Sequence, residues 1–412
     1  MNRFAIRSLY RSLTRDRVYA ALNIGGLAVG MAAAILLTLF VSFETSFEKW
    51  VPDHEEIYLV QTDMRAPNQP FSGRHHWTMG GLLDQIHEDF PGITGTRLEP
   101  QGVSVIEGGV AVEENMKRVD DTFFDVFDLP MIAGEGRGAL TDPTNILVSQ
   151  SVAQRYFGTQ QAVGHSLTTM LDGERRAVRI AGVFADLPPN SELDFTILSR
   201  LPDGIDLPWW RNWGSTSLQT FLRFSTEEEA GRFEAATDAF VDRRAAGSYG
   251  ENASEDIGIN LLPIADWHLT PQGRQPDSRR QTVLTLGLVG LLTLLIAIVN
   301  YVNLATARAA LRAREVAIRK VVGGDRASLI RQFLAEAIGT VALAGLLGLV
   351  LVELALPFVN AAGGLELTLH YVGREGVVLP LVLIVLVIGL VAGAYPAVVL
   401  SRFGPASVLA SA

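Results

Sequence analysis

The chain of 412 residues is 48% hydrophobic and only 19% charged, and its mean hydropathy is +0.25. These values exclude an ordinary soluble protein, and the absence of cysteine excludes thiol catalysis, iron–sulfur clusters and cysteine zinc sites. Four apolar runs explain the composition, and each is long enough to cross about 30 Å of hydrocarbon as a helix. They lie at residues 18–43, 282–307, 337–362 and 376–401. We therefore predict a polytopic membrane protein.

Charge predicts the orientation of the chain. Residues 1–18 carry five arginines and one aspartate, and residues 306–332 carry seven basic and two acidic residues. Residues 44–280 instead carry 20 basic and 37 acidic residues. Because cytoplasmic loops are enriched in lysine and arginine, we expect both termini and the 306–332 loop in the cytoplasm. The chain would be a multi-pass protein of the cytoplasmic (inner) membrane, with its acidic segment outside.

The expected fold is an α-helical bundle of four transmembrane helices, with a large mixed α/β extracytoplasmic domain inserted between the first and second helices. In chain order we expect a basic cytoplasmic segment (1–18), transmembrane helix 1 (19–43), the extracytoplasmic domain (44–281), transmembrane helix 2 (282–304), a cytoplasmic loop (305–332), transmembrane helix 3 (333–358), a short outer loop (359–376), transmembrane helix 4 (377–400) and a cytoplasmic tail (401–412).

The first apolar run could also belong to a signal peptide, since five arginines precede it. Its uncharged stretch is longer than the roughly 7–15 residues typical of such a peptide, and no clean A-x-A cleavage site follows. We therefore expect a retained membrane anchor.

Two glycine pairs predict close helix packing. Gly26 and Gly30 lie in the first span, and Gly389 and Gly393 lie in the fourth. Each pair has the small-xxx-small spacing that lets a second helix approach the backbone. Such stripes fit a bundle within one chain or a dimer of two chains, and both stay open.

The extracytoplasmic domain has the pattern of a mixed α/β fold. Alternating apolar residues predict strands at 56–63, 103–108, 218–224 and 257–264, and helical spacing predicts helices at 79–90 and 226–244. Since strand–helix–strand units stand at both ends, we expect the two ends to build one subdomain. Residues from about 109 to 215 would form a second, inserted lobe that is rich in turns.

A search for catalytic or metal-binding motifs yields no site. The three lysines, at positions 49, 117 and 320, stand outside any G-x-x-x-x-G-K-[ST] sequence, so this chain has no P-loop. Neither G-x-S-x-G nor H-E-x-x-H occurs. We expect no catalytic residue, no metal and no cofactor in this chain, and any ATPase would be another subunit.

Three clusters have simpler interpretations than ligand binding. Adjacent histidines such as His75 and His76 point apart and lack a third ligand, which indicates a surface pair. The acidic cluster at 120–128 lacks the glycine and the closing glutamate of a calcium loop, which indicates a solvated helix face over Phe123, Phe124 and Phe127. Three tryptophans at 209–213 could stack on a ligand, but burial is the favoured interpretation.

The stretch from 300 to 336 joins an apolar helix to a basic segment that breaks at Gly323 and Gly324. Alanines dominate its first part and favour a stiff helix that continues past the membrane. Residues 316–322 then place apolar side chains on one face of a short helix, which must be buried against lipid or a partner protein. Asp325 is a suitable N-cap for the helix that enters the third span.

EVAIRKVVGG at 315–324 resembles the REVGIRK-A-x-GA signature of permeases of the MacB/FtsX-like ABC transporter superfamily. NYVNLATARAALRAREVAIRK at 300–320 is similar to the longer form of that motif. The likeness continues over nearly the whole chain, in residues 16–60, 119–135, 145–167, 183–195, 261–273 and 393–409. The sequence departs from the pattern in having Ala317 where glycine is usual and Gly324 where alanine is usual.

The resemblance implies four transmembrane helices, a MacB-like periplasmic core domain between the first two, and an FtsX-like transmembrane domain. Such permeases dimerise and work with separate or fused ATPase subunits, whose closure acts on the loop after the second helix. Mechanotransmission then drives the periplasmic domain. By position in the motif, the ATPase-coupling residues would be Arg314, Glu315, Ile318, Arg319, Lys320, Gly323 and Gly324.

The resemblance thus implies a non-enzymatic permease subunit that exports or handles a drug, peptide or lipid-like substrate. Its partners would be an ABC ATP-binding subunit that binds the ATP, membrane lipid, and a second copy or a second permease half, without nucleic acid. One alternative is an FtsX-like regulator of a periplasmic partner such as a cell-wall hydrolase, and another is a membrane-anchored sensor without an ATPase. Similar members join two such halves in tandem, so we expect either a half-size permease that homodimerises or a shortened product.

Overall fold

The computed structural model describes residues 17–66, 71–171, 173–202, 209–311, 325–373 and 376–402, without the side chains of residues 308–311, 326 and 395–402. The chain divides into two compact units. Met1–Phe43 and Thr282–Ala412 form one, which we call the helical unit, and Glu44–Gln281 form the other, which we call the α/β unit.

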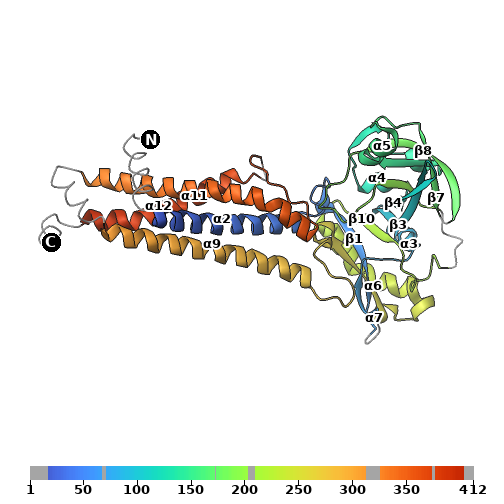
Figure 1. Ribbon diagram of the computed structural model, residues 1–412. Coiled ribbons are helices and arrows are strands. Elements are labelled where there is room, and N and C mark those ends of the chain that lie inside the picture. The colour runs from blue at the N-terminus through green and yellow to red at the C-terminus, as the bar shows by residue number, and fades with distance from the viewer. Residues whose placement is uncertain are drawn as a thin grey trace, which may run out of the picture. The chain divides into compact units, whose positions relative to one another are not determined.

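The helical unit is built from long apolar helices that run side by side (Figure 1). They are α2 (Arg17–Glu44), α9 (Ser278–Leu311), α11 (Arg326–Gly363) and α12 (Val378–Arg402). Within the described residues, Arg17–Glu44, Ser278–Ala307 and Ala327–Gly363 are long and apolar enough to cross a membrane, and α12 is apolar over the shorter stretch Val378–Ala394. Three candidate spans are therefore shown, and the fourth stays a prediction.

The four helices share one core. Buried apolar side chains come from each of them, including Leu27 and Met31 of α2, Ala297 of α9, Val341 of α11 and Ile388 of α12. Asp325 stands at the N-cap of α11 with an extended backbone, as its position predicts, but its side chain makes no capping hydrogen bond.

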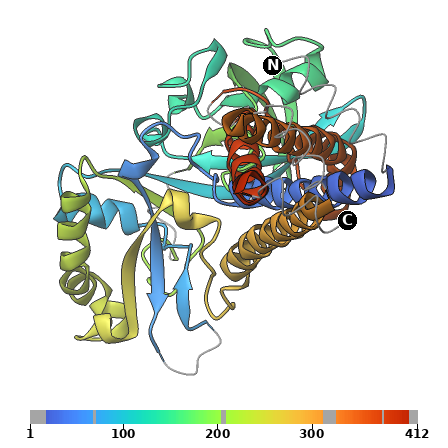
Figure 2. The same cartoon turned by 90° about the vertical axis from the view of Figure 1, so that its left-hand side faces the viewer.

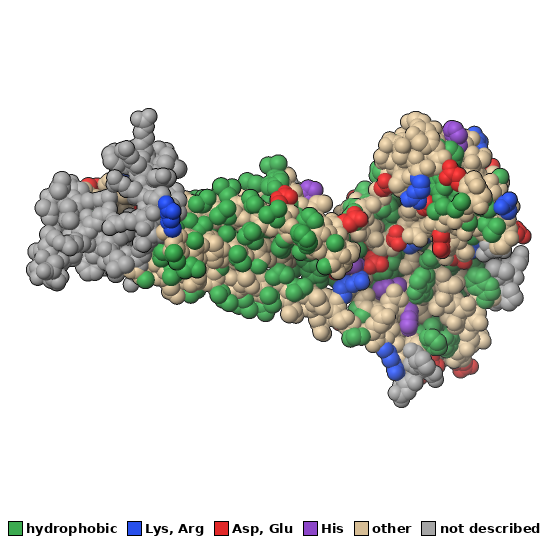
Figure 3. All heavy atoms as spheres, viewed as in Figure 1, with side chains coloured by type: hydrophobic (Ala, Val, Ile, Leu, Met, Phe, Trp, Pro, Cys, Tyr) green, Lys and Arg blue, Asp and Glu red, His purple; other side chains and the backbone are tan. Residues whose placement is uncertain are grey.

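The outer surface of the helical unit is apolar (Figure 3). On α9 alone, Leu284, Leu288, Leu291, Leu295, Ile296 and Val299 are all exposed. A contiguous apolar surface of this kind would be unfavourable in water and is what hydrocarbon solvates. The α/β unit instead carries its charged side chains on the surface (Figure 3).

The α/β unit contains one twisted sheet of eleven described strands. They are β1 (Ile57–Met64), β2 (Gly73–His75), β3 (Thr94–Glu107), β4 (Val110–Val119), β5 (Met131–Gly134), β6 (Asn145–Ser149), β7 (Ser166–Leu171), β8 (Glu174–Phe184), β9 (Ile197–Arg200), β10 (Gln219–Arg223) and β11 (Ile257–Pro263). The order is β11-β1-β10-β3-β4-β9-β6-β8-β5, with β2 beside β1 and β7 beside β3 and β8.

Short helices and turns connect the strands. They are η1 (His54–Glu56), α3 (Leu82–Asp89), α4 (Phe123–Val126), η2 (Ala139–Thr141), α5 (Gln150–Phe157), α6 (Glu227–Tyr249), α7 (Ala253–Asp256) and α8 (Ile264–Trp267). Figure 2 shows the same arrangement from a second direction. Side chains of α3 and α6 form a core with those of β1, β10 and β11, and α5 closes a second core over β6 and β8.

The two ends of the α/β unit build one part of the sheet, as predicted. Tyr58 of β1 pairs with Leu222 of β10 on one side and with Pro263 of β11 on the other. β3 then continues the sheet into the inserted part, because its first residues pair with β10 and its later residues with β4 and β7. The strand predicted at 103–108 is therefore only the end of a longer strand.

The predicted helix at 226–244 is confirmed as α6. Thr226 is its N-cap, and the hydroxyl of Thr226 accepts a hydrogen bond from the backbone N–H of Glu229 at 3.2 Å. The Glu229 carboxylate in turn accepts from the backbone N–H of Ser225 at 3.0 Å. This reciprocal arrangement satisfies donors that a helix start leaves free.

Candidate functional site

The residues expected to contact an ATPase lie outside the described residues. This holds for Arg314, Glu315, Ile318, Arg319, Lys320, Gly323 and Gly324. Their roles therefore remain predictions, and the site that the structure does show lies in the α/β unit.

The glycine pairs lie at helix contacts inside the helical unit. A Cβ on Gly30 of α2 would overlap the Cβ of Ala297 on α9, and a Cβ on Gly26 would lie 3.8 Å from the side-chain nitrogen of Asn300. A Cβ on Gly389 of α12 would approach Ile338 of α11 to 2.6 Å. A Cβ on Gly393 of α12 would likewise approach Ala337 and Leu334 of α11. The structure thus uses both stripes within one chain.

A partly buried polar cluster lies where the chain enters and leaves the α/β unit. Its members are Glu44, Glu192, His268 and Arg279, which we call the histidine cluster. Glu44 is the last residue of α2 and Arg279 lies in the first turn of α9. Glu192 lies between β8 and β9, and His268 follows α8, which buries Ile264 and Trp267 and so fixes the position of the next residue.

The imidazole of His268 lies between two carboxylates. Its Nδ1 is 2.7 Å from Oε1 of Glu192, and its Nε2 is 3.0 Å from Oε2 of Glu44. The ring also stacks on Phe47 with centroids 3.3 Å apart. Arg279 donates to the backbone carbonyl of His268 at 3.0 Å. With an acceptor at each nitrogen, the ring can donate two hydrogen bonds only as an imidazolium.

The pKa shifts agree with an ion pair. Burial disfavours the charged imidazole, but the hydrogen bonds to Glu192 and Glu44 outweigh it and raise the pKa of His268 above its ordinary value. Burial likewise disfavours the Glu192 carboxylate, but the hydrogen bond from His268 holds the pKa of Glu192 below its ordinary value. Both directions show that each group stabilises the charged form of the other.

Residues 46–48, directly after α2, also bind the segment that contains Glu192. The amide of Asn190 donates to the backbone carbonyl of Ser46 at 3.1 Å. Oε1 of Glu48 accepts from the Ser191 hydroxyl at 2.9 Å and from the backbone N–H of Glu192 at 2.6 Å. Glu48 is fully buried with φ 56°, and burial raises its pKa to about 7. A buried carboxylate in a left-handed conformation indicates a contact that the surrounding fold enforces.

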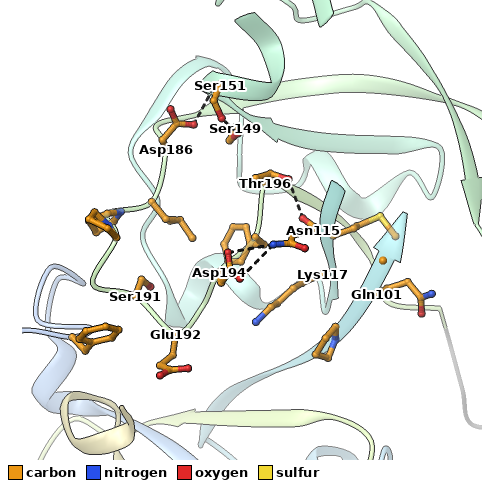
Figure 4. A pocket seen from close by; sticks show the side chains of 18 residues that line it. Gln101, Asn115, Lys117, Ser149, Ser151, Asp186, Ser191, Glu192, Asp194 and Thr196 are labelled. Carbon is orange, nitrogen blue, oxygen red and sulfur yellow. Dashed lines mark hydrogen bonds between the residues drawn. The ribbon is translucent and has the colours of Figure 1, made fainter. Parts of the chain in front are cut away.

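Beside this segment lies a cavity of about 770 Å³. Figure 4 shows Asn115 and Lys117 of β4, Ser149 and Ser151 at the start of α5, and the 186–196 segment around it. Burial lowers the pKa of the Lys117 ammonium to about 8.

The structure corrects the interpretation of His75 and His76 as a surface pair. His76 is buried, and its Nδ1 accepts a hydrogen bond from the indole N–H of Trp267 at 3.1 Å. Burial lowers the pKa of His76 to about 4, so the ring is neutral at physiological pH. His76 is therefore a buried side chain that packs against Trp267 in the interior of the α/β unit.

The acidic and tryptophan clusters are structural. Asp120 receives hydrogen bonds from Arg97, and Phe123 and Phe127 are buried, which confirms the aromatic core but not a fully solvated acidic face. Within the described part of the chain no three acidic or histidine side chains converge on a metal position. Trp210 and Trp213 are buried, as predicted, whereas Trp209 is only half-buried.

Sequence reasoning missed the histidine cluster, although all of its residues except Arg279 stood in stretches that carried the family resemblance. Residues 16–60 contain Glu44 and Glu48, 183–195 contain Glu192, and 261–273 contain His268. No single stretch signals the cluster, because His268 is 224 positions from Glu44 and 76 from Glu192.

Comparisons with known proteins match both units. The MacB-like periplasmic core domain family matches residues 20–242, and the FtsX-like permease C-terminal family matches residues 287–405. The macrolide export ATP-binding/permease protein MacB of Psychrobacter cryohalolentis is 27% identical over 134 residues, which cover 31% of this chain and 20% of that protein. The chain thus matches about a fifth of the length of this curated relative.

Two solved structures are similar in part. A domain of a permease protein from Porphyromonas gingivalis has a TM-score of 0.44 at 24% identity, covering 55% of this chain and 94% of that domain. The periplasmic region of MacB from Actinobacillus actinomycetemcomitans has a TM-score of 0.35 at 12% identity, covering 57% of this chain and 98% of that region.

The helix contact at Gly30 predicts a position-specific effect of an added methyl group. Gly30→Ala should destabilise the helical unit by about 1–3 kcal/mol, because the new methyl overlaps Ala297 in a packed core. The measurement is the temperature at which the purified chain in detergent loses half of its monodisperse fraction. Gly25→Ala is the matched control, because a Cβ there meets nothing within 4 Å. Equal midpoints for the two variants would contradict the packing.

The histidine cluster predicts a pH-dependent loss of stability. His268→Gln should lower the free energy of unfolding by roughly 1–3 kcal/mol at pH 6, because it leaves the buried carboxylate of Glu44 and the half-buried carboxylate of Glu192 without their charged donor. Since the folded pKa of His268 is raised, its contribution is fully present below its ordinary pKa of 6.5 and is lost as the pH rises through the folded pKa. The difference between wild type and variant should therefore shrink by pH 9.

Tryptophan fluorescence during urea unfolding of the full chain measures this effect. All six tryptophans, from Trp50 to Trp267, lie in the α/β unit and report on it alone. His87→Gln, at an exposed position on α3, is the control. A loss of stability in His268→Gln that is the same at pH 6 and pH 9 would rule out the charged pair.

Proposed function

Because the chain belongs to the MacB/FtsX-like family of ABC-type permeases, we propose that it transmits the motion of a separate ATPase to its α/β unit. The chain is a multi-pass inner-membrane protein with a MacB-like periplasmic domain. Its role as the permease subunit follows from the family, and the mechanical coupling is the proposal. The observation that carries it is the histidine cluster.

The cluster supports transmission through continuity of the chain. α2 ends at Glu44, itself a member of the cluster, and α9 begins one residue before Arg279. A displacement of either helix end therefore acts directly on His268 and Glu192 through hydrogen bonds of 2.7–3.0 Å. Because breaking a buried ion pair is costly, the paired groups move together more readily than they separate.

The motion would come from an ATP-binding partner. The sequence lacks a P-loop, so ATP would be bound by the partner and this chain would need no cofactor. The partner would dock on the 305–332 loop and contact Arg314, Arg319 and Lys320. A basic loop with an apolar helix face suits a groove that offers both acidic and apolar side chains.

The membrane arrangement extends the same proposal. α12 would be the fourth span, with both termini in the cytoplasm according to the charge distribution. The exposed apolar side chains of α9 would contact lipid or a second permease half. A homodimer of this chain would offer two identical docking surfaces, related by twofold symmetry, to two ATPase subunits. The MacB relative is named as an export protein, and for this chain we infer export or periplasmic handling of a drug, peptide or lipid-like substrate.

Charge reversal in the loop tests the ATPase contact. Arg314→Glu with Arg319→Glu should weaken capture of the cognate ABC ATPase at least about tenfold, because two cations of the proposed contact become anions. The measurement is the amount of ATPase that co-purifies with the tagged permease from membranes, together with ATP hydrolysis by the complex.

Arg175→Glu is the control, because it reverses one charge at the exposed start of strand β8, far along the chain from the loop. The control should retain the complex. Unchanged capture and unchanged ATP hydrolysis in the double variant would reject the assigned contact residues.

A further inference from the structure

The cavity in the α/β unit has the dimensions of a ligand site. Its volume of about 770 Å³ falls within the range of roughly 300–1,000 Å³ typical of small-molecule pockets. Polar side chains cover much of its wall, and Pro188, Pro189, Leu187 and Phe195 supply an apolar part. Glu192 of the histidine cluster lies in its wall, so the cavity adjoins the residues of the proposed coupling.

Lys117 is the group in this cavity whose charge lacks a partner. The residue is only 7% exposed, and Figure 4 shows its side chain extending from β4 into the cavity. Among the described residues none forms a hydrogen bond or an ion pair with its ammonium group. A buried ammonium without an acceptor is unfavourable, and burial accordingly lowers the pKa of Lys117 to about 8, although the carboxylates of Asp194, Glu192 and Glu48 act in the opposite direction.

Most of the neighbouring carboxylates are already engaged. Asp186 accepts from the backbone N–H of Ser151 at 2.9 Å, and Glu192 accepts from His268 at 2.7 Å. Asp194 differs, because its two oxygens receive only the Asn115 amide, at 3.4 Å each. Asp194 also has φ 24°, in the range that glycine favours. The residue is exposed, so its carboxylate is open to a ligand from solvent.

The charged side chains that line the cavity favour some classes of ligand over others. One ammonium, that of Lys117, and three carboxylates, those of Asp186, Glu192 and Asp194, line the cavity, so its wall has a net negative charge. This charge disfavours a dianion such as phosphate, while the unpartnered ammonium requires an acceptor. A molecule with one carboxylate and one ammonium satisfies both conditions.

We propose that this cavity binds a small zwitterion with an α-amino-acid headgroup, whose carboxylate pairs with Lys117 and whose ammonium pairs with Asp194. The apolar wall of Pro188, Pro189 and Phe195 then receives an apolar side chain of the ligand. Each group of the ligand meets the group of the cavity that lacks a close partner.

Competitive labelling of lysines tests the site in the full chain in detergent. The sequence has only three lysines, so reductive methylation followed by peptide mass spectrometry reports each one separately. Leucine is the probe, and leucinamide, 4-methylpentanoate and inorganic phosphate are its matched comparisons. Leucine should slow methylation of Lys117 in a saturable manner and leave exposed Lys49 unchanged.

Leucinamide lacks the carboxylate and 4-methylpentanoate lacks the ammonium, so each should protect Lys117 at least about tenfold more weakly than leucine. Absence of protection by leucine would overturn the proposal. Equal protection by leucinamide, by 4-methylpentanoate or by phosphate would overturn it as well, because the headgroup would then not be recognised.

Variants separate binding from a structural role. Lys117→Met keeps the length of the side chain and should lower the affinity for leucine, measured by calorimetry, roughly 10- to 100-fold. It should not lower the urea midpoint, because it removes an unpartnered buried charge. Lys49→Met is the control and should bind leucine as wild type does. A lower midpoint with unchanged affinity would assign Lys117 to the fold instead. The measurements involve no ATPase, so the cavity and the proposed coupling can fail separately.

Discussion

The His268 imidazole between the carboxylates of buried Glu44 and half-buried Glu192 is the interaction on which the rest of the structure depends. Burying these charges is tolerable only when all of them are paired. The pairing joins the last residue of α2, the segment between β8 and β9, and the chain just before α9. The first and last residues of the α/β unit, where the chain leaves α2 and enters α9, are thereby bonded to each other and to the segment between β8 and β9.

One segment of the α/β unit serves two purposes. Residues 190–192 are bound to residues 46–48 by side-chain and backbone hydrogen bonds, and Glu192 adds the ion pair with His268. Ser191 and Glu192 of this segment also line the 770 Å³ cavity, together with Asp194 on the same stretch of chain and Lys117, which extends from β4 (Figure 4). We infer that a ligand in the cavity and a movement of α2 or α9 would act on the same few residues. This is a physical route by which occupancy and helix motion could influence each other.

Patterns of neighbouring residues predicted individual helices and strands, whereas contacts between residues far apart in the sequence were not predicted. The alternation at 56–63 and the Thr226 cap each depend on neighbouring residues, and β1 and α6 formed as expected. The histidine cluster depends on the pairing of β1 with β11, which brings His268 to a residue 224 positions earlier in the chain. His76 was misjudged for the same reason, because the indole that buries it, Trp267, lies 191 positions later. The predicted coupling residues, including Arg314 and Arg319, lie outside the described residues, so that part of the site still stands on the family motif alone.

The most direct test of transmission through the histidine cluster uses the absence of native cysteine. Glu251→Cys, between α6 and α7, and Arg175→Cys, in β8, place spin labels at two exposed positions of the α/β unit. The distance between the labels is measured by pulsed electron spin resonance in the ATPase complex, once with ATP and once with ADP. The account predicts a nucleotide-dependent change of this distance in the otherwise wild-type chain. It also predicts loss of the change in His268→Gln while ATP hydrolysis continues. A change of equal size in His268→Gln would contradict it.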